Sequence, residues 1–117
     1  MVDTGHTVEA LFAGKDPAVR TIYARLLEVL GALGPCREEP KQTSVHLARV
    51  SGFAGVHPRK SALLLNLRTA GPIDSPRVVK REQVSKNRWH NEVKLAAAEE
   101  VDAELLAWLR EAYALAG

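Results

Sequence analysis

The chain contains a single cysteine, Cys36, among its 117 residues. An internal disulfide is therefore excluded, and so is a zinc site built from several cysteines of one chain. The longest apolar runs, such as residues 62–65, are too short to cross a membrane, and no signal-peptide pattern follows Met1. These absences predict a cytoplasmic protein that works in a reducing compartment and away from the membrane.

The sequence also lacks the common catalytic motifs. It has no Ser-His-Asp pattern, no HExxH motif, no glycine-rich phosphate loop and no paired carboxylates. The acids Glu38 and Glu39 lie beside Cys36, where they disfavour the thiolate and argue against a nucleophile. The carboxylates between residues 41 and 94 are Asp74, Glu82 and Glu92. A general base in this region would have to be a histidine, with Glu92 as the group that orients it.

Positive charge gathers in the middle of the chain. Residues 41–94 hold eleven lysines and arginines against three acids, a net charge of +8, although the whole chain carries only +2. A segment this basic predicts an anionic partner. The alternative is that lysine and arginine keep a sheet soluble and block pairing at its edges.

Apolar residues recur at helical spacing near both ends of the chain. One stripe follows the Asp16-Pro17 start signal and ends at Gly34-Pro35, and a second covers residues 96–115. A shorter helix over residues 8–13 is capped by Thr7. We expect a flexible tail at residues 1–6 and a single domain over residues 7–117.

Between the helices the pattern indicates short strands near residues 36–39, 43–50, 53–56, 61–67, 77–84 and 89–95. Residues 62–65 show no alternation, which predicts a central strand that is covered on both faces. Strands in succession predict hairpins, hence an α+β fold with a mostly antiparallel sheet of about five strands. The N-terminal and C-terminal helices would cover one face, and the other would display the excess cations.

Three histidines lie in or beside this basic sheet. His46 and His90 face away from their strands' apolar sets, and His57 opens a stiff His-Pro-Arg-Lys turn. Trp89 could stack on a planar ligand, although its alignment with Val93 favours the core. The candidate ligand-binding residues are His46, Arg49, His57, Arg59, Lys60, Arg88, Trp89 and His90. Taken singly, each histidine is better explained as an exposed sheet residue or a satisfied turn residue.

No cofactor is expected, and we expect no metal site, because the neighbouring arginines repel a cation.

The strings LFAGKDP, TSVHL, FAGVHPRK, NRWHNEVKL and DAELLAWLREAY occur in this order between residues 11 and 113, within a resemblance that extends from about residue 8 to residue 114. In this combination the chain resembles an uncharacterised bacterial family, domain of unknown function 5655. Members of that family occur alone, behind another uncharacterised domain, or behind a restriction-endonuclease-like domain, and some relatives are labelled predicted transport proteins. The resemblance implies no activity and no site residues. Relatives often carry Ser or Asp near the start of the last helix, where this chain has Ala96, Ala97 and Ala98.

The sequence therefore predicts a binding module rather than an enzyme. Its ligand would be anionic, either a nucleotide-like small molecule or nucleic acid, bound on the histidine-bearing face of the sheet. One alternative is a small enzyme in which a sheet histidine does acid–base work in a pocket lined by Arg49 and Arg59. Another is an interaction domain that dimerises through a sheet edge or the first helix, so that both a monomer and a homodimer stay open.

Overall fold

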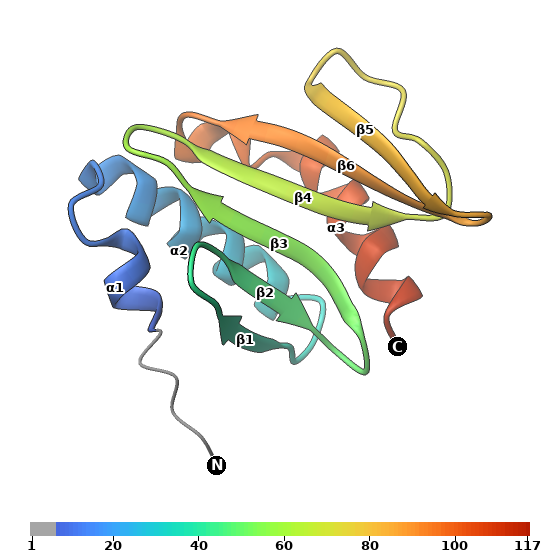
Figure 1. The fold of residues 1–117 in the computed structure, drawn as a ribbon, viewed down its shortest axis with the longest axis horizontal. Coiled ribbons are helices and arrows are strands. Elements are labelled where there is room, and N and C mark those ends of the chain that lie inside the picture. Colours follow the sequence, from blue (N-terminus) through green and yellow to red (C-terminus); the bar gives the residue numbers. More distant parts are fainter. Residues whose placement is uncertain (1–6) are drawn as a thin grey trace.

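The computed structural model describes residues 7–117, and the expected tail at residues 1–6 lies outside the described part. The predicted α+β class is confirmed, with six antiparallel strands instead of about five (Figure 1). The elements are α1 (Val8–Phe12), α2 (Pro17–Gly31), β1 (Arg37–Pro40), β2 (Val45–Ala48), β3 (Gly52–Pro58), β4 (Leu63–Thr69), β5 (Val78–Ser85), β6 (Arg88–Leu95), η1 (Ala98–Glu100) and α3 (Ala103–Leu115).

The strand order is β1-β2-β3-β4-β6-β5, and every neighbouring pair is antiparallel. The first four strands form a meander. After β4 the chain crosses to the edge of the sheet, forms β5, and turns back so that β6 fills the place beside β4.

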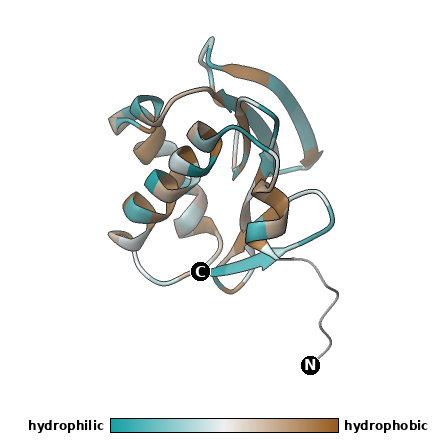
Figure 2. Ribbon diagram, turned by 90° about the vertical axis from the view of Figure 1, so that its left-hand side faces the viewer, coloured by the Kyte–Doolittle hydropathy of each residue, from teal (hydrophilic) through white to brown (hydrophobic). Residues whose placement is uncertain are grey.

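The helices cover one face of the sheet only. Figure 1 looks onto the uncovered side with α2 and α3 behind the strands, and Figure 2 shows helices and sheet as two layers. The core between the layers holds the apolar stripes of both helices and the inward side chains of the strands. Among residues 7–117 no helix is long and apolar enough to span a bilayer.

The central strand differs from its prediction in one respect. β4 lies at the centre of the sheet beside β3, as expected, but it is not covered on both faces. Leu63, Leu65 and Leu67 are fully buried under the helices, whereas Leu64, Asn66 and Arg68 are only half-buried on the opposite side. The leucine run hid an ordinary alternation, because one leucine also stands on the outer face. We call this outer side of the sheet the free face.

Two element boundaries also differ. His57 and Pro58 belong to β3, where Pro58 pairs with Leu63, and the turn begins only at Arg59, whose N–H donates to the carbonyl of Ala62 at 2.8 Å. The last helix does not start at residue 96.

A short 3₁₀ turn, η1, stands at the expected beginning of that helix, and α3 begins at Ala103. Asp102 is its N-cap, and the Asp102 carboxylate accepts from the N–H of Leu105 at 3.0 Å. The capping aspartate therefore lies a few residues beyond the three alanines.

Candidate functional site

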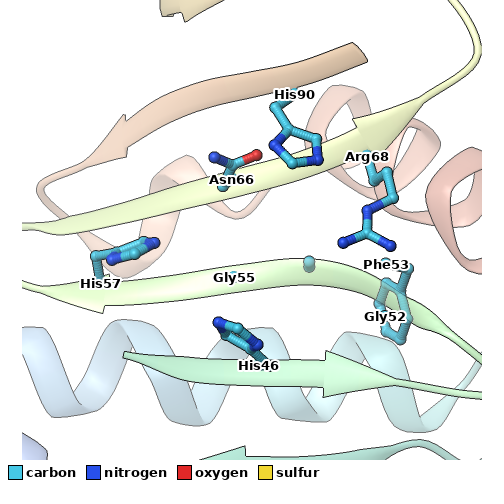
Figure 3. A pocket seen from close by; sticks show the side chains of 9 residues that line it. His46, Gly52, Phe53, Gly55, His57, Asn66, Arg68 and His90 are labelled. Carbon is cyan, nitrogen blue, oxygen red and sulfur yellow. The ribbon is translucent and has the colours of Figure 1, made fainter. Parts of the chain in front are cut away.

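A half-open hollow lies on the free face, away from the helices (Figure 3). Four strands contribute to it: β2, β3, β4 and β6. The lining residues are His46, Gly52, Phe53, Ala54, Gly55, His57, Asn66, Arg68 and His90. Its volume is about 140 Å³, close to that of an engineered cavity of about 150 Å³ that accepts one benzene molecule. The hollow therefore suits one phosphate or carboxylate group, or one ring.

Strand register brings these side chains together. His46 on β2 pairs with Gly55 on β3, and Gly55 pairs with Asn66 on β4. One step along the same face, Arg68 on β4 pairs with His90 on β6. Side chains of one face repeat every second residue, so each pair presents its polar groups to the same side.

Gly55 forms the floor of the hollow. A Cβ built at this position would lie 3.4 Å from Nε2 of His57 and 3.8 Å from Cβ of Asn66. The missing side chain therefore opens the space between the imidazole and the amide, and a ligand can approach the backbone of β3 there.

Arg68 is the one arginine that lines the hollow. Its side chain is half-buried, and a Cβ at Gly52 would lie 3.7 Å from its Nη2. Within residues 7–117 its guanidinium forms no ion pair. Burial and the nearby charge of Arg88 lower the pKa of Arg68. A guanidinium in this position lacks a compensating negative charge.

The pKa values of two of the three histidines are lowered, which favours the neutral imidazole. Burial and the charge of Arg59 lower the pKa of His57, against a weaker opposing effect of Glu92. Burial and the charge of Arg68 lower the pKa of His90, which Glu82 partly opposes. A neutral imidazole donates from one nitrogen and accepts at the other, so each can adapt to a ligand.

Acidic side chains flank the hollow without lining it. Register places Glu39 opposite His46, Glu92 opposite Asn66 and Glu82 opposite His90. Among residues 7–117 there is no cluster of three or more His, Cys, Asp or Glu side chains that could hold a metal ion.

The structure brings His46, His57 and His90 into the hollow but not the other five predicted residues. Arg49 follows β2, and its side chain reaches the C-terminal end of α3. There the guanidinium donates to the carbonyl of Tyr113 at 2.9 Å and stacks 4.1 Å from the centre of the Tyr113 ring. The expected pocket lined by Arg49 and Arg59 is therefore not formed.

The remaining candidates lie elsewhere. Arg59 and Lys60 line a separate groove beside α1. Arg88 lines a small recess that adjoins the hollow and shares Gly52 and Arg68 with it. Trp89 is half-exposed. It lies on the helix side of β6, the side that it shares with Asn91 and Val93.

Sequence reasoning missed Asn66, Arg68 and the two glycines of the hollow. The sequence of β4 contained the pattern that could have identified Asn66 and Arg68. Leu63, Leu65 and Leu67 occupy every second position, and Asn66 and Arg68 lie between and after them on the opposite face. The additional leucine at position 64 masked it.

The comparisons with known proteins bear on the family alone. No curated protein and no solved structure matches the chain. A family model described as "Domain of unknown function (DUF5655)" matches residues 8–116. This span includes all strands and helices and every residue of the hollow. The chain therefore belongs to the DUF5655 family.

Proposed function

We propose that this domain is a binding module for a small anionic ligand, which it holds in the hollow of the free face. The observation that carries the proposal is Arg68, a half-buried arginine with no ion-pair partner among the described residues, in a hollow that three histidines also line. An anionic group seated on Arg68 would supply the missing negative charge. Arginine presents two parallel N–H groups that match a phosphate or a carboxylate.

The surroundings of Arg68 support this role. Asn66 and His90, the register partner of Arg68, offer donors near the guanidinium, whereas His57 lines the other end of the hollow, and none of the lining residues is acidic. A bound anion would favour protonation of the imidazoles that line the hollow, so that they would become additional positive partners. The volume of about 140 Å³ accommodates a single phosphate but not a whole nucleotide. We infer a phosphate-bearing ligand that reaches beyond the hollow.

The test compares Arg68→Gln with Arg110→Gln. Both variants remove one positive charge, and Arg110 is exposed on α3, on the opposite side of the sheet. Binding of sulfate and adenosine monophosphate is measured by calorimetry and by histidine NMR shifts at an ionic strength of about 0.01 M, where screening is weak.

We expect binding to the wild type, shifts at His46, His57 and His90, and unchanged affinity in Arg110→Gln. Arg68→Gln should weaken binding roughly tenfold or more, since a hydrogen bond to a charged group contributes about 1.5–3 kcal/mol. Equal affinity in the two variants, or undetectable binding to the wild type, would overturn the proposal.

A further inference from the structure

A second cationic site lies beside the hollow, in a groove between α1, the β1–β2 turn and the β3–β4 turn. We call it the basic groove, after Lys15, Arg59 and Lys60, which line it together with Gln42 and Thr43. It has a volume of about 600 Å³, and no acidic residue is among those that line it. Within residues 7–117 none of its three cations forms an ion pair.

The backbone that carries these cations is anchored. The N–H of Arg59 donates to the carbonyl of Ala62 at 2.8 Å, and the carbonyl of Lys60 accepts from the N–H of Asp16 at 2.8 Å. The second bond joins the β3–β4 turn to the start of α2. Pro58 is buried and removes freedom from the residue that precedes the turn. Cations presented from such a turn lose less entropy on binding than cations on a free loop.

The basic groove and the hollow meet at β3, on opposite sides of the strand. His57 lines the hollow on the free face, whereas Pro58, the next residue, pairs with the inward-facing Leu63 and lines the groove. At a rise of about 3.3 Å per residue, Arg59 lies roughly 7 Å along β3 from His57 and roughly 20 Å from the position of Arg68, because Leu67 pairs with Ala54. The charge of Arg59 also reaches the hollow, because it contributes to the lowered pKa of His57.

We propose that the ligand is a chain of linked phosphates, with one group on Arg68 in the hollow and groups several units further along the chain on Lys15, Arg59 and Lys60 in the basic groove. This proposal rests on the function proposed above. Two cationic sites, the hollow and the basic groove, match a ligand with several linked negative groups. A single monophosphate would fill only the hollow. A single-stranded oligonucleotide and inorganic polyphosphate both have this chemistry. An oligonucleotide could also stack a base on a histidine ring or on the guanidinium plane.

The experiment measures the affinity of the full chain for three probes: adenosine monophosphate, a single-stranded oligonucleotide of about four to eight nucleotides, and polyphosphate with the same number of phosphates. The variant is the double substitution Lys15→Gln, Lys60→Gln. The matched control is Lys86→Gln, Arg110→Gln, which removes the same charge at exposed positions in the β5–β6 turn and on α3. Thermal unfolding verifies that both variants are folded.

We expect at least one long probe to bind tenfold or more tightly than the monophosphate. The groove variant should lose this gain and keep the wild-type affinity for the monophosphate, and the control should keep both. The salt slope of the long probe should fall in the groove variant by about 0.7 for each lysine removed. The long probe that shows the gain identifies the source of the phosphate chain.

Two results would overturn the inference while leaving monophosphate binding intact: long probes that bind no more tightly than the monophosphate, or a groove variant that weakens all probes equally. If the wild type bound none of the probes, the proposed function would fail as well.

Discussion

At the scale of single residues, Asn91 shows how the sheet accommodates a polar group in its core. The side chain is fully buried on the helix side of β6. Its Oδ1 accepts from the N–H of Ile73 at 3.0 Å, and its Nδ2 donates to Oγ1 of Thr69 at 2.8 Å. One amide thus ties the crossing loop of residues 70–77 to the two strands beneath it.

Replacing Asn91 by alanine should destabilise the fold. The substitution leaves the buried N–H of Ile73 without a partner, which costs about 1–3 kcal/mol. Urea unfolding checks the size of the loss. Asn87→Ala serves as the control, because Asn87 is exposed in the β5–β6 turn and should change stability by less than about 0.5 kcal/mol. A stable Asn91→Ala protein would show that the loop is held by other contacts.

The sequence contained much of this residue-scale information. Alternation placed His46 and His90 on the outer face, and the structure brings both to one hollow. Arg68 was not predicted as a site residue, because the neighbouring leucines suggested a strand buried on both faces. Arg49 was predicted as one, because charge and chain position do not reveal its contact with Tyr113, which is 64 residues away.

At the scale of elements, the connection after α2 depends on one glycine. Gly34 has a φ of +143°, and a Cβ there would collide with the hydroxyl of Tyr113. That hydroxyl donates to the carbonyl of Pro35 at 2.9 Å and so joins the connection to α3.

We expect Gly34→Ala to lower the free energy of unfolding by about 1–3 kcal/mol, because only glycine adopts this backbone conformation without strain. Gly31→Ala is the matched control. Gly31 ends α2, and a Cβ there meets nothing within 4 Å. The control should be neutral or stabilise the protein by up to about 1 kcal/mol. Denaturant midpoints compare the two, and equal midpoints would contradict the assignment.

The start of α3 gives another element-scale prediction. The N–H of Leu105 and the guanidinium of Arg77 lower the pKa of Asp102. Because Asp102 caps α3, Asp102→Ala should cost about 1 kcal/mol at neutral pH, and Asp102→Asn should cost less because asparagine also caps helices. Since the folded-state pKa lies below the ordinary 3.8, this stabilisation is present above that value and disappears as the pH falls through the lowered pKa. Urea unfolding at neutral and acidic pH measures it, and a loss of equal size in both variants would assign the effect to charge alone.

At the scale of the whole molecule, the order of elements predicted the fold class, since uninterrupted strands between two helices favour an antiparallel sheet under a helical layer. The crossing of β5 and β6 was not predictable. Local patterns indicate where strands lie, whereas strand order is decided by contacts between distant residues, such as the bond of Asn91 to the crossing loop.

Stability of the whole domain should depend on pH and on anions together. The pKa values of His57 and His90 are lowered in the folded state below the ordinary 6.5. As the pH falls from about 8 to about 5, the unfolded chain takes up protons that the folded chain resists, and the free energy of unfolding decreases. Sulfate in the hollow should counter this decrease, because an anion favours the protonated imidazoles.

Thermal unfolding across this pH range, with and without sulfate, measures both effects. The double variant His57→Asn, His90→Asn should flatten the pH dependence and reduce the stabilisation by sulfate. An unchanged pH profile in that variant would assign the titration to other groups.

The bare backbone at Gly55 gives the molecule an adjustable recess. Its φ is not in the left-handed region, so alanine, serine and valine can each occupy the position without backbone strain. Each added atom would remove a known increment of space while the surrounding charges stay unchanged. In such a series, the side-chain size at position 55 at which binding stops would measure the width of the ligand group that occupies the hollow.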